Sequence, residues 1–150
     1  MNYLAHIAQD GRQQTASEHL NGTAELCAGF AASFGAEDQG RLAGLAHDLG
    51  KYSAAFQRRL NGGPKVDHST AGAAECAKLN QGCAAFAVAG HHGGLPDGGG
   101  QGDHWEGKTF HSRMQKAVLG RLAPYEAWQK EISLPPASQP AFSSQPEEMF

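Results

Sequence analysis

The chain has 150 residues and a hydrophobic fraction of 40%, enough for one domain with a real core. Valine and isoleucine are scarce, which disfavours an extensive sheet, and the formal net charge of −3 gives no sign of a nucleic-acid binder. Three cysteines without a C-x-x-C pair exclude a disulfide framework or a zinc finger. Since neither a signal pattern nor a run of 18 apolar residues occurs, we expect a soluble, cytoplasmic protein without a membrane partner.

Apolar residues recur at helical spacing in seven segments joined by turns. In chain order the expected helices cover residues 15–34, 38–48, 54–60, 67 or 69 to about 81, 84–92, 109–122 and 124–132, after an extended or irregular lead-in over residues 1–14. Thr15 and Glu18 have the spacing of a capping box at the first helix. The Gly-rich stretch 95–107 is expected to be a surface loop. We therefore predict an all-α domain over residues 1–132 and a Pro/Ser/Gln-rich tail or linker over residues 133–150.

Histidines and one aspartate stand at or near the ends of these expected helices. They are His19, His47, Asp48, His68, His91 and His92. Short helices joined by tight loops can bring such ends to one pocket. Imidazoles with a carboxylate suit first-row transition ions better than Mg²⁺ or Ca²⁺, which prefer oxygen ligands. Because six ligands exceed what one tetrahedral ion takes, two ions bridged by Asp48 fit the pattern better.

An isolated histidine on a helix is more often a hydrogen-bonded or surface residue than a metal ligand. We give that interpretation to His6 in the lead-in, His104 in the polar loop and His111 near a helix start. Lys51 follows His47 by one helical turn and would by itself be an ordinary solvated lysine. Beside a metal cluster, its ammonium group would instead meet an anionic substrate.

Three segments together resemble the HD nuclease domain of the CRISPR-associated helicase–nuclease of type I interference systems. They read HDLGKYS at 47–53, DHS at 67–69 and HHGGL at 91–95. The His-Asp pair is common to HD phosphohydrolases, whereas the three segments in combination are more specific to the CRISPR group. The resemblance covers about residues 3–97, and His19 matches the histidine of the family's first helix.

The resemblance implies an all-α HD-domain helical bundle of about six to seven helices, which degrades single-stranded DNA with two divalent transition-metal ions (Mn, Ni, Co, Fe or Zn). It assigns one ion to His19, His47 and Asp48, and the second ion to Asp48, His68, His91 and His92. Asp48 and Lys51 become the expected catalytic residues, with Lys51 near the scissile phosphate and Ser69 near the second ion. The implied partners are single-stranded DNA, a superfamily 2-type helicase on the same or a separate chain, and a crRNA-guided surveillance complex.

One departure from the family pattern concerns the first ion. The family completes that site with an aspartate on a later helix, and this sequence offers only Asp103, which comes too early, and then Glu147 and Glu148. We therefore expect a fragment or truncated product without the last helices, in which the second ion binds more securely. No G-x-x-x-x-G-K-[ST] motif occurs, so any helicase lies on other sequence. Two alternatives stay open: an HD phosphohydrolase acting on nucleotides or cyclic dinucleotides, and a non-catalytic binding module.

Overall fold

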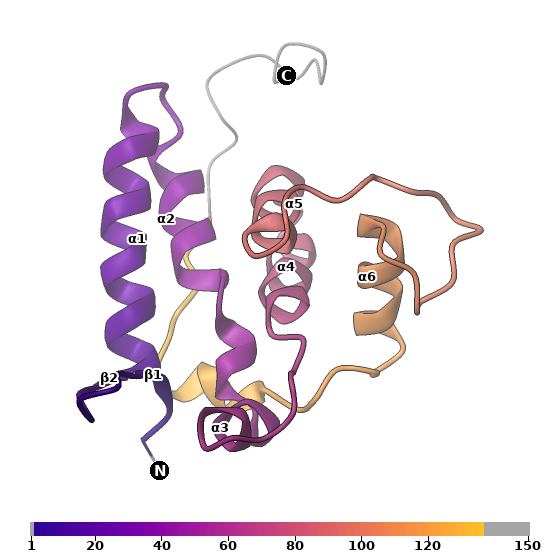
Figure 1. The fold of residues 1–150 in the computed structure, drawn as a ribbon. Coiled ribbons are helices and arrows are strands. Elements are labelled where there is room, and N and C mark those ends of the chain that lie inside the picture. Colours follow the sequence, from indigo (N-terminus) through magenta and orange to yellow (C-terminus); the bar gives the residue numbers. More distant parts are fainter. Residues whose placement is uncertain (1, 137–150) are drawn as a thin grey trace.

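A computed structural model describes residues 2–136 and confirms the predicted all-α class (Figure 1). The elements, in chain order, are β1 (Leu4–Ile7), β2 (Gln13–Thr15), α1 (Ala16–Ala32), α2 (Glu37–Ala46), the 3-10 helix η1 (Leu49–Tyr52), α3 (Ala54–Leu60), α4 (Ser69–Lys78), α5 (Gly82–Gly90), α6 (Phe110–Val118) and the 3-10 helix η2 (Glu126–Lys130). None of the helices within residues 2–136 has the length and apolar character of a membrane span. The predicted tail lies, from residue 137, outside the described residues.

Helices α1 and α2 run side by side as an antiparallel pair (Figure 1). The predicted capping box begins α1: the Thr15 hydroxyl accepts a bond from the Glu18 backbone N–H, and the Glu18 carboxylate accepts one from the Thr15 N–H. The two helices pack through small residues: a Cβ atom added to Gly44 of α2 would lie 2.5 Å from the Cα atom of buried Ala24 in α1. The expected first helix ends with Phe34 as its last apolar residue, but Phe34 is 58% exposed because α1 has already ended at Ala32.

Helices α4 and α5 form a second pair, and the end of α2 meets α4 at close range. A Cβ atom added to Gly72 in α4 would lie 1.8 Å from the Ala46 carbonyl oxygen, and one added to Gly50 would lie 2.4 Å from the His68 carbonyl oxygen. Only glycine permits these backbone approaches. They hold the residues that follow α2 against the start of α4.

The two ends of the described chain differ from the prediction. The lead-in is a β-hairpin in which β1 pairs antiparallel with β2, because the chain turns back at Gly11, whose φ is +86°. Helix α6 ends at Val118, since Gly120 at φ +67° turns the chain. The expected last helix over 124–132 is the 3-10 helix η2, fastened to the core by buried Trp128.

Two glycine substitutions test the close contact between α2 and α4. Gly72→Ala should lower the free energy of unfolding by more than about 2 kcal/mol, because the new methyl group overlaps the Ala46 carbonyl group. Gly29→Ala is the matched control inside α1, where a Cβ atom meets nothing within 4 Å, and it should raise stability by about 0.5–1 kcal/mol through helix propensity. Urea unfolding measures both. Equal effects from the two substitutions would contradict the described packing.

Candidate metal centre

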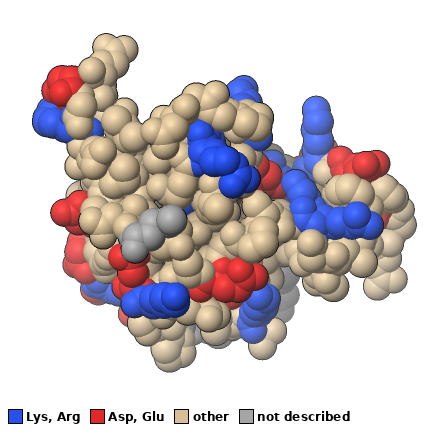
Figure 2. Space-filling model, turned by 90° about the horizontal axis from the view of Figure 1, so that it is seen from below, with Lys and Arg blue, Asp and Glu red and all other residues tan. Residues whose placement is uncertain are grey.

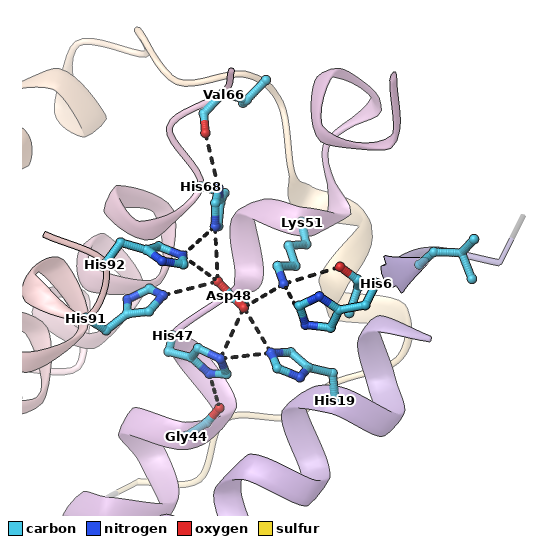
Figure 3. Close-up of polar contacts among 12 residues, drawn as sticks. His6, His19, Gly44, His47, Asp48, Lys51, Val66, His68, His91 and His92 are labelled. Atoms are coloured by element: carbon cyan, nitrogen blue, oxygen red, sulfur yellow. Dashed lines mark hydrogen bonds and ion pairs between the residues drawn. The ribbon is translucent and has the colours of Figure 1, made fainter. Parts of the chain in front are cut away.

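The Asp48 carboxylate lies at the centre of a group of imidazole rings (Figure 3). Asp48 directly follows the C-cap residue of α2 and is only 2% exposed. Its Oδ2 atom lies 2.9 Å from His19 Nε2, 3.1 Å from His47 Nε2 and 2.9 Å from Lys51 Nζ. Its Oδ1 atom lies 3.2 Å from His91 Nε2, 3.4 Å from His68 Nε2 and 3.7 Å from His92 Nε2. The two oxygens thus divide the histidines into an Oδ2 group and an Oδ1 group.

Helix ends supply these histidines. His19 comes from the first turn of α1, His47 is the C-cap residue of α2, His68 the N-cap residue of α4, and His91 the C-cap residue of α5, followed by His92. The structure therefore brings together the six side chains that sequence analysis singled out. In each group the potential ligand atoms lie within 4.8 Å of one another, a geometry that could hold a metal ion.

Backbone carbonyl groups fix the orientation of three of the rings. His47 Nδ1 donates to the Gly44 carbonyl at 2.7 Å, and His91 Nδ1 to the Val88 carbonyl at 2.7 Å. His68 Nδ1 donates in the same way to the Val66 carbonyl at 3.1 Å. These contacts assign the proton of each neutral ring to Nδ1, so that the Nε2 lone pair points toward Asp48. Metal-binding histidines are commonly held by such a bond on their other ring nitrogen.

The arrangement of lone pairs fits a metal cation. An Nε2 lone pair facing a carboxylate oxygen at about 3 Å is repulsive unless a proton or a cation lies between them. Burial lowers the pKa of His68 and of His92, which disfavours a proton there. Moreover, His19 Nε2 lies 3.0 Å from His47 Nε2. Two nitrogens that bind one ion at about 2.0–2.1 Å, at right angles to each other, are about 3 Å apart, so this pair has a spacing that one ion can bridge. The donor set therefore fits transition-metal ions on both sides of Asp48.

Neighbouring groups keep Asp48 ionised. Burial alone would raise the pKa of this carboxyl, but a hydrogen bond from the His19 imidazole, first among the ring contacts, holds its pKa well below the ordinary value. The Lys51 ammonium pairs with Oδ2 and also donates to the Ala5 carbonyl at 3.3 Å. Lys51 itself is only 3% exposed. Its most immediate partner is thus Asp48, whose position it fixes.

Sequence analysis missed that His6 lies at this centre. His6 Nε2 is 3.3 Å from Lys51 Nζ, and the His6 ring packs edge-on against the His19 ring with centroids 4.8 Å apart. The hairpin delivers His6, and nothing in the sequence of the lead-in indicated where that hairpin would dock. By contrast, His111 contacts Gln115 and His104 packs beside Trp105, so neither of them joins either group.

A groove of about 750 Å³ opens beside the Oδ1 group. Its lining includes Lys51, His68, Ser69 and His92, so the predicted substrate-binding residues line the same groove. The His92 side chain is 55% exposed, whereas that of His47 is 13% exposed. A substrate therefore reaches the Oδ1 group more directly than the Oδ2 group.

A comparison with protein-family models matches residues 16–130 of the chain to the HD domain. The matched range includes every residue of the two groups and leaves out the hairpin that carries His6. No curated protein matches the chain significantly. The chain belongs to the HD domain family, whose members are metal-dependent hydrolases.

Substitutions on either side of Asp48 should separate two ions. The Oδ2 group has one histidine fewer and shares its oxygen with the Lys51 ammonium, so we predict that it holds the weaker ion. In a Mn²⁺ titration followed by calorimetry, His47→Ala should abolish the weaker binding phase and His91→Ala the tighter one. Because His111 lies outside both groups, the His111→Ala variant should keep both binding phases. Loss of the same phase in both site variants would contradict the division.

Proposed function

We propose that this chain is a metal-dependent nuclease that hydrolyses phosphodiester bonds of single-stranded DNA with two divalent transition-metal ions. The observation that carries the proposal is the division of five histidine nitrogens between the two oxygens of Asp48. Adjacent ions suit phosphoryl displacement. When bound, they would activate a water molecule and neutralise charge on the attacking and leaving oxygens.

The protein's own contribution is to hold these groups in place before a substrate arrives. Asp48 would contribute a ligand to each ion, and Lys51 fixes its carboxylate by an ion pair of 2.9 Å. The hydrogen bonds from Nδ1 of His47 and His91 to helix carbonyl groups keep Nε2 of both rings pointed toward Asp48. Lys51 also lines the groove beside the Oδ1 group, so it can oppose the charge that develops on a phosphate bound there. Such prior positioning lowers the cost of reorganisation during the reaction.

The narrower proposal, a role in CRISPR interference, is supported by the three sequence segments in combination, and their residues also have local structural roles. In HDLGKYS, Lys51 pairs with Asp48, and Ser53 caps α3 by accepting a bond from the Phe56 N–H. In DHS, Asp67 accepts a bond from the Thr70 N–H at the start of α4. We propose a superfamily 2-type helicase, on the same or a separate chain, and a crRNA-guided surveillance complex as partners that would deliver the DNA strand.

Circular single-stranded DNA tests this function, because it offers no ends and so reports endonuclease cleavage. Protein loaded with Mn²⁺ or Ni²⁺ should linearise the circle, and Asp48→Ala should reduce the rate by about 100-fold or more, since it removes the shared ligand. His111→Ala should retain activity. A panel of nucleotides and cyclic dinucleotides is assayed in parallel.

Two results would contradict the proposal. Hydrolysis of nucleotides or cyclic dinucleotides with no cleavage of DNA would assign the chain to the small-molecule phosphohydrolases. Metal-loaded protein that acts on none of these substrates would instead indicate a non-catalytic binding module.

A further inference from the structure

Positive side chains gather beside the Oδ1 group although the chain as a whole is acidic. The groove described above adjoins a smaller hollow of about 310 Å³, and Asp67 and Arg113 line both. Six of the chain's 12 Lys and Arg residues line the two hollows, against two of its 15 Asp and Glu residues. The six are Lys51, Arg59, Lys65, Lys108, Arg113 and Lys116. Figure 2 shows blue side chains on both sides of the notch between the main body and the part that projects to the right.

Arg113 connects the metal centre to the smaller hollow. It lies on α6, and its guanidinium group donates to the carbonyl of Ala89, near the end of the helix that presents His91 and His92. That bond uses one of the five N–H donors of a guanidinium group and holds the side chain in a defined position. The remaining donors are available to phosphate oxygens, which arginine recognises in a planar, paired geometry.

Trp105 gives the smaller hollow an aromatic wall. The indole is partly exposed and lines the hollow together with Lys108 and Lys116. The Arg121 guanidinium carbon lies 5.1 Å from the centroid of the indole ring, which adds a further cation at this place. Lys116 is also held by Asp67 at 2.8 Å, whereas no salt bridge in the described part of the chain includes Lys108. Cationic grooves with aromatic side chains are the usual surface for single strands, because the cations follow the backbone and the rings stack on bases.

We propose that Arg113, Lys108 and Trp105 form a binding track for a single nucleic-acid strand that runs from the metal centre across α6. One phosphate contacts Arg113 between the two hollows, the next backbone segment contacts Lys108, and a base stacks on Trp105. A mononucleotide would occupy only one of the hollows, so the track selects a polymer. The reaction at the metal centre rests on the proposed function, but strand binding can be measured without it.

Binding of a fluorescein-labelled oligo-dT in EDTA tests the track without any cleavage. The wild-type intrinsic fluorescence should be partly quenched, since Trp105 is partly exposed while the other tryptophan, Trp128, is buried. Trp105→Leu should remove the quenching and weaken binding by about 5- to 100-fold, and Trp105→Phe should restore much of the affinity because it keeps a stacking ring. Restoration by Phe distinguishes stacking from a general loss of structure.

Arg113 should contribute to strand binding electrostatically, and its contribution is measured by the salt dependence of the affinity. Arg113→Gln should weaken binding and reduce the slope of log affinity against log salt by about 0.7, the value for one phosphate contact on a single strand. Lys78→Gln, at the far end of α4 and outside both hollows, is the matched control and should leave affinity and slope unchanged.

The outcomes separate this inference from the proposed function. If Trp105→Leu and Arg113→Gln bind oligo-dT as tightly as Lys78→Gln does, the track is wrong, even if the protein cleaves DNA. The same holds if the wild type binds no oligo-dT at low salt. If the two variants lose binding while the metal-loaded wild type cleaves nucleotides alone, the track is supported and the proposed nuclease activity fails.

Discussion

One buried negative charge constrains this fold. A carboxylate that is removed from water is costly unless it is paired and hydrogen-bonded, and the Asp48 carboxylate is almost completely enclosed. The Lys51 ammonium and a hydrogen bond from His19 offset part of that cost, and cations held by the imidazole rings would offset more, but only if the ends of several helices meet around Asp48. The close approach of Gly72 to the Ala46 carbonyl brings two of those ends together. The contacts that pack these small-residue helices therefore also bring the side chains of the site together.

The chemistry of helix C-termini does the remaining positioning. The last turn of a helix has carbonyl groups without intrahelical partners. His47 and His91, both C-cap residues, donate from Nδ1 to the carbonyl three residues earlier, which turns Nε2 toward Asp48. The same C-terminal hydrogen bond thus orients a histidine at the ends of two helices, on opposite sides of the carboxylate. It explains how short alanine-rich helices can build a centre that fits metal ions.

Local signals in the sequence predicted most of the helices and the candidate metal ligands. The capping box of Thr15 and Glu18 gave a helix start that the structure confirms, and the histidines at expected helix ends gave the set of candidate ligands, whereas their division into two groups came from the resemblance to the HD nuclease domain. The parts that were missed depend on contacts far apart in the chain. His6 reaches the centre only because the hairpin docks there, and net charge cannot tell where cations gather. Phe34 kept the apolar period, but its helix had already ended.

The central claim is that the Asp48 carboxylate joins two adjacent metal sites. Electron paramagnetic resonance of protein loaded with two equivalents of Mn²⁺ tests it most directly, because ions about 3.5–4 Å apart under a shared carboxylate are magnetically coupled. We predict an exchange-coupled spectrum that Asp48→Ala abolishes. A spectrum of isolated Mn²⁺ ions in the wild type, or a coupled spectrum that survives in Asp48→Ala, would contradict this account.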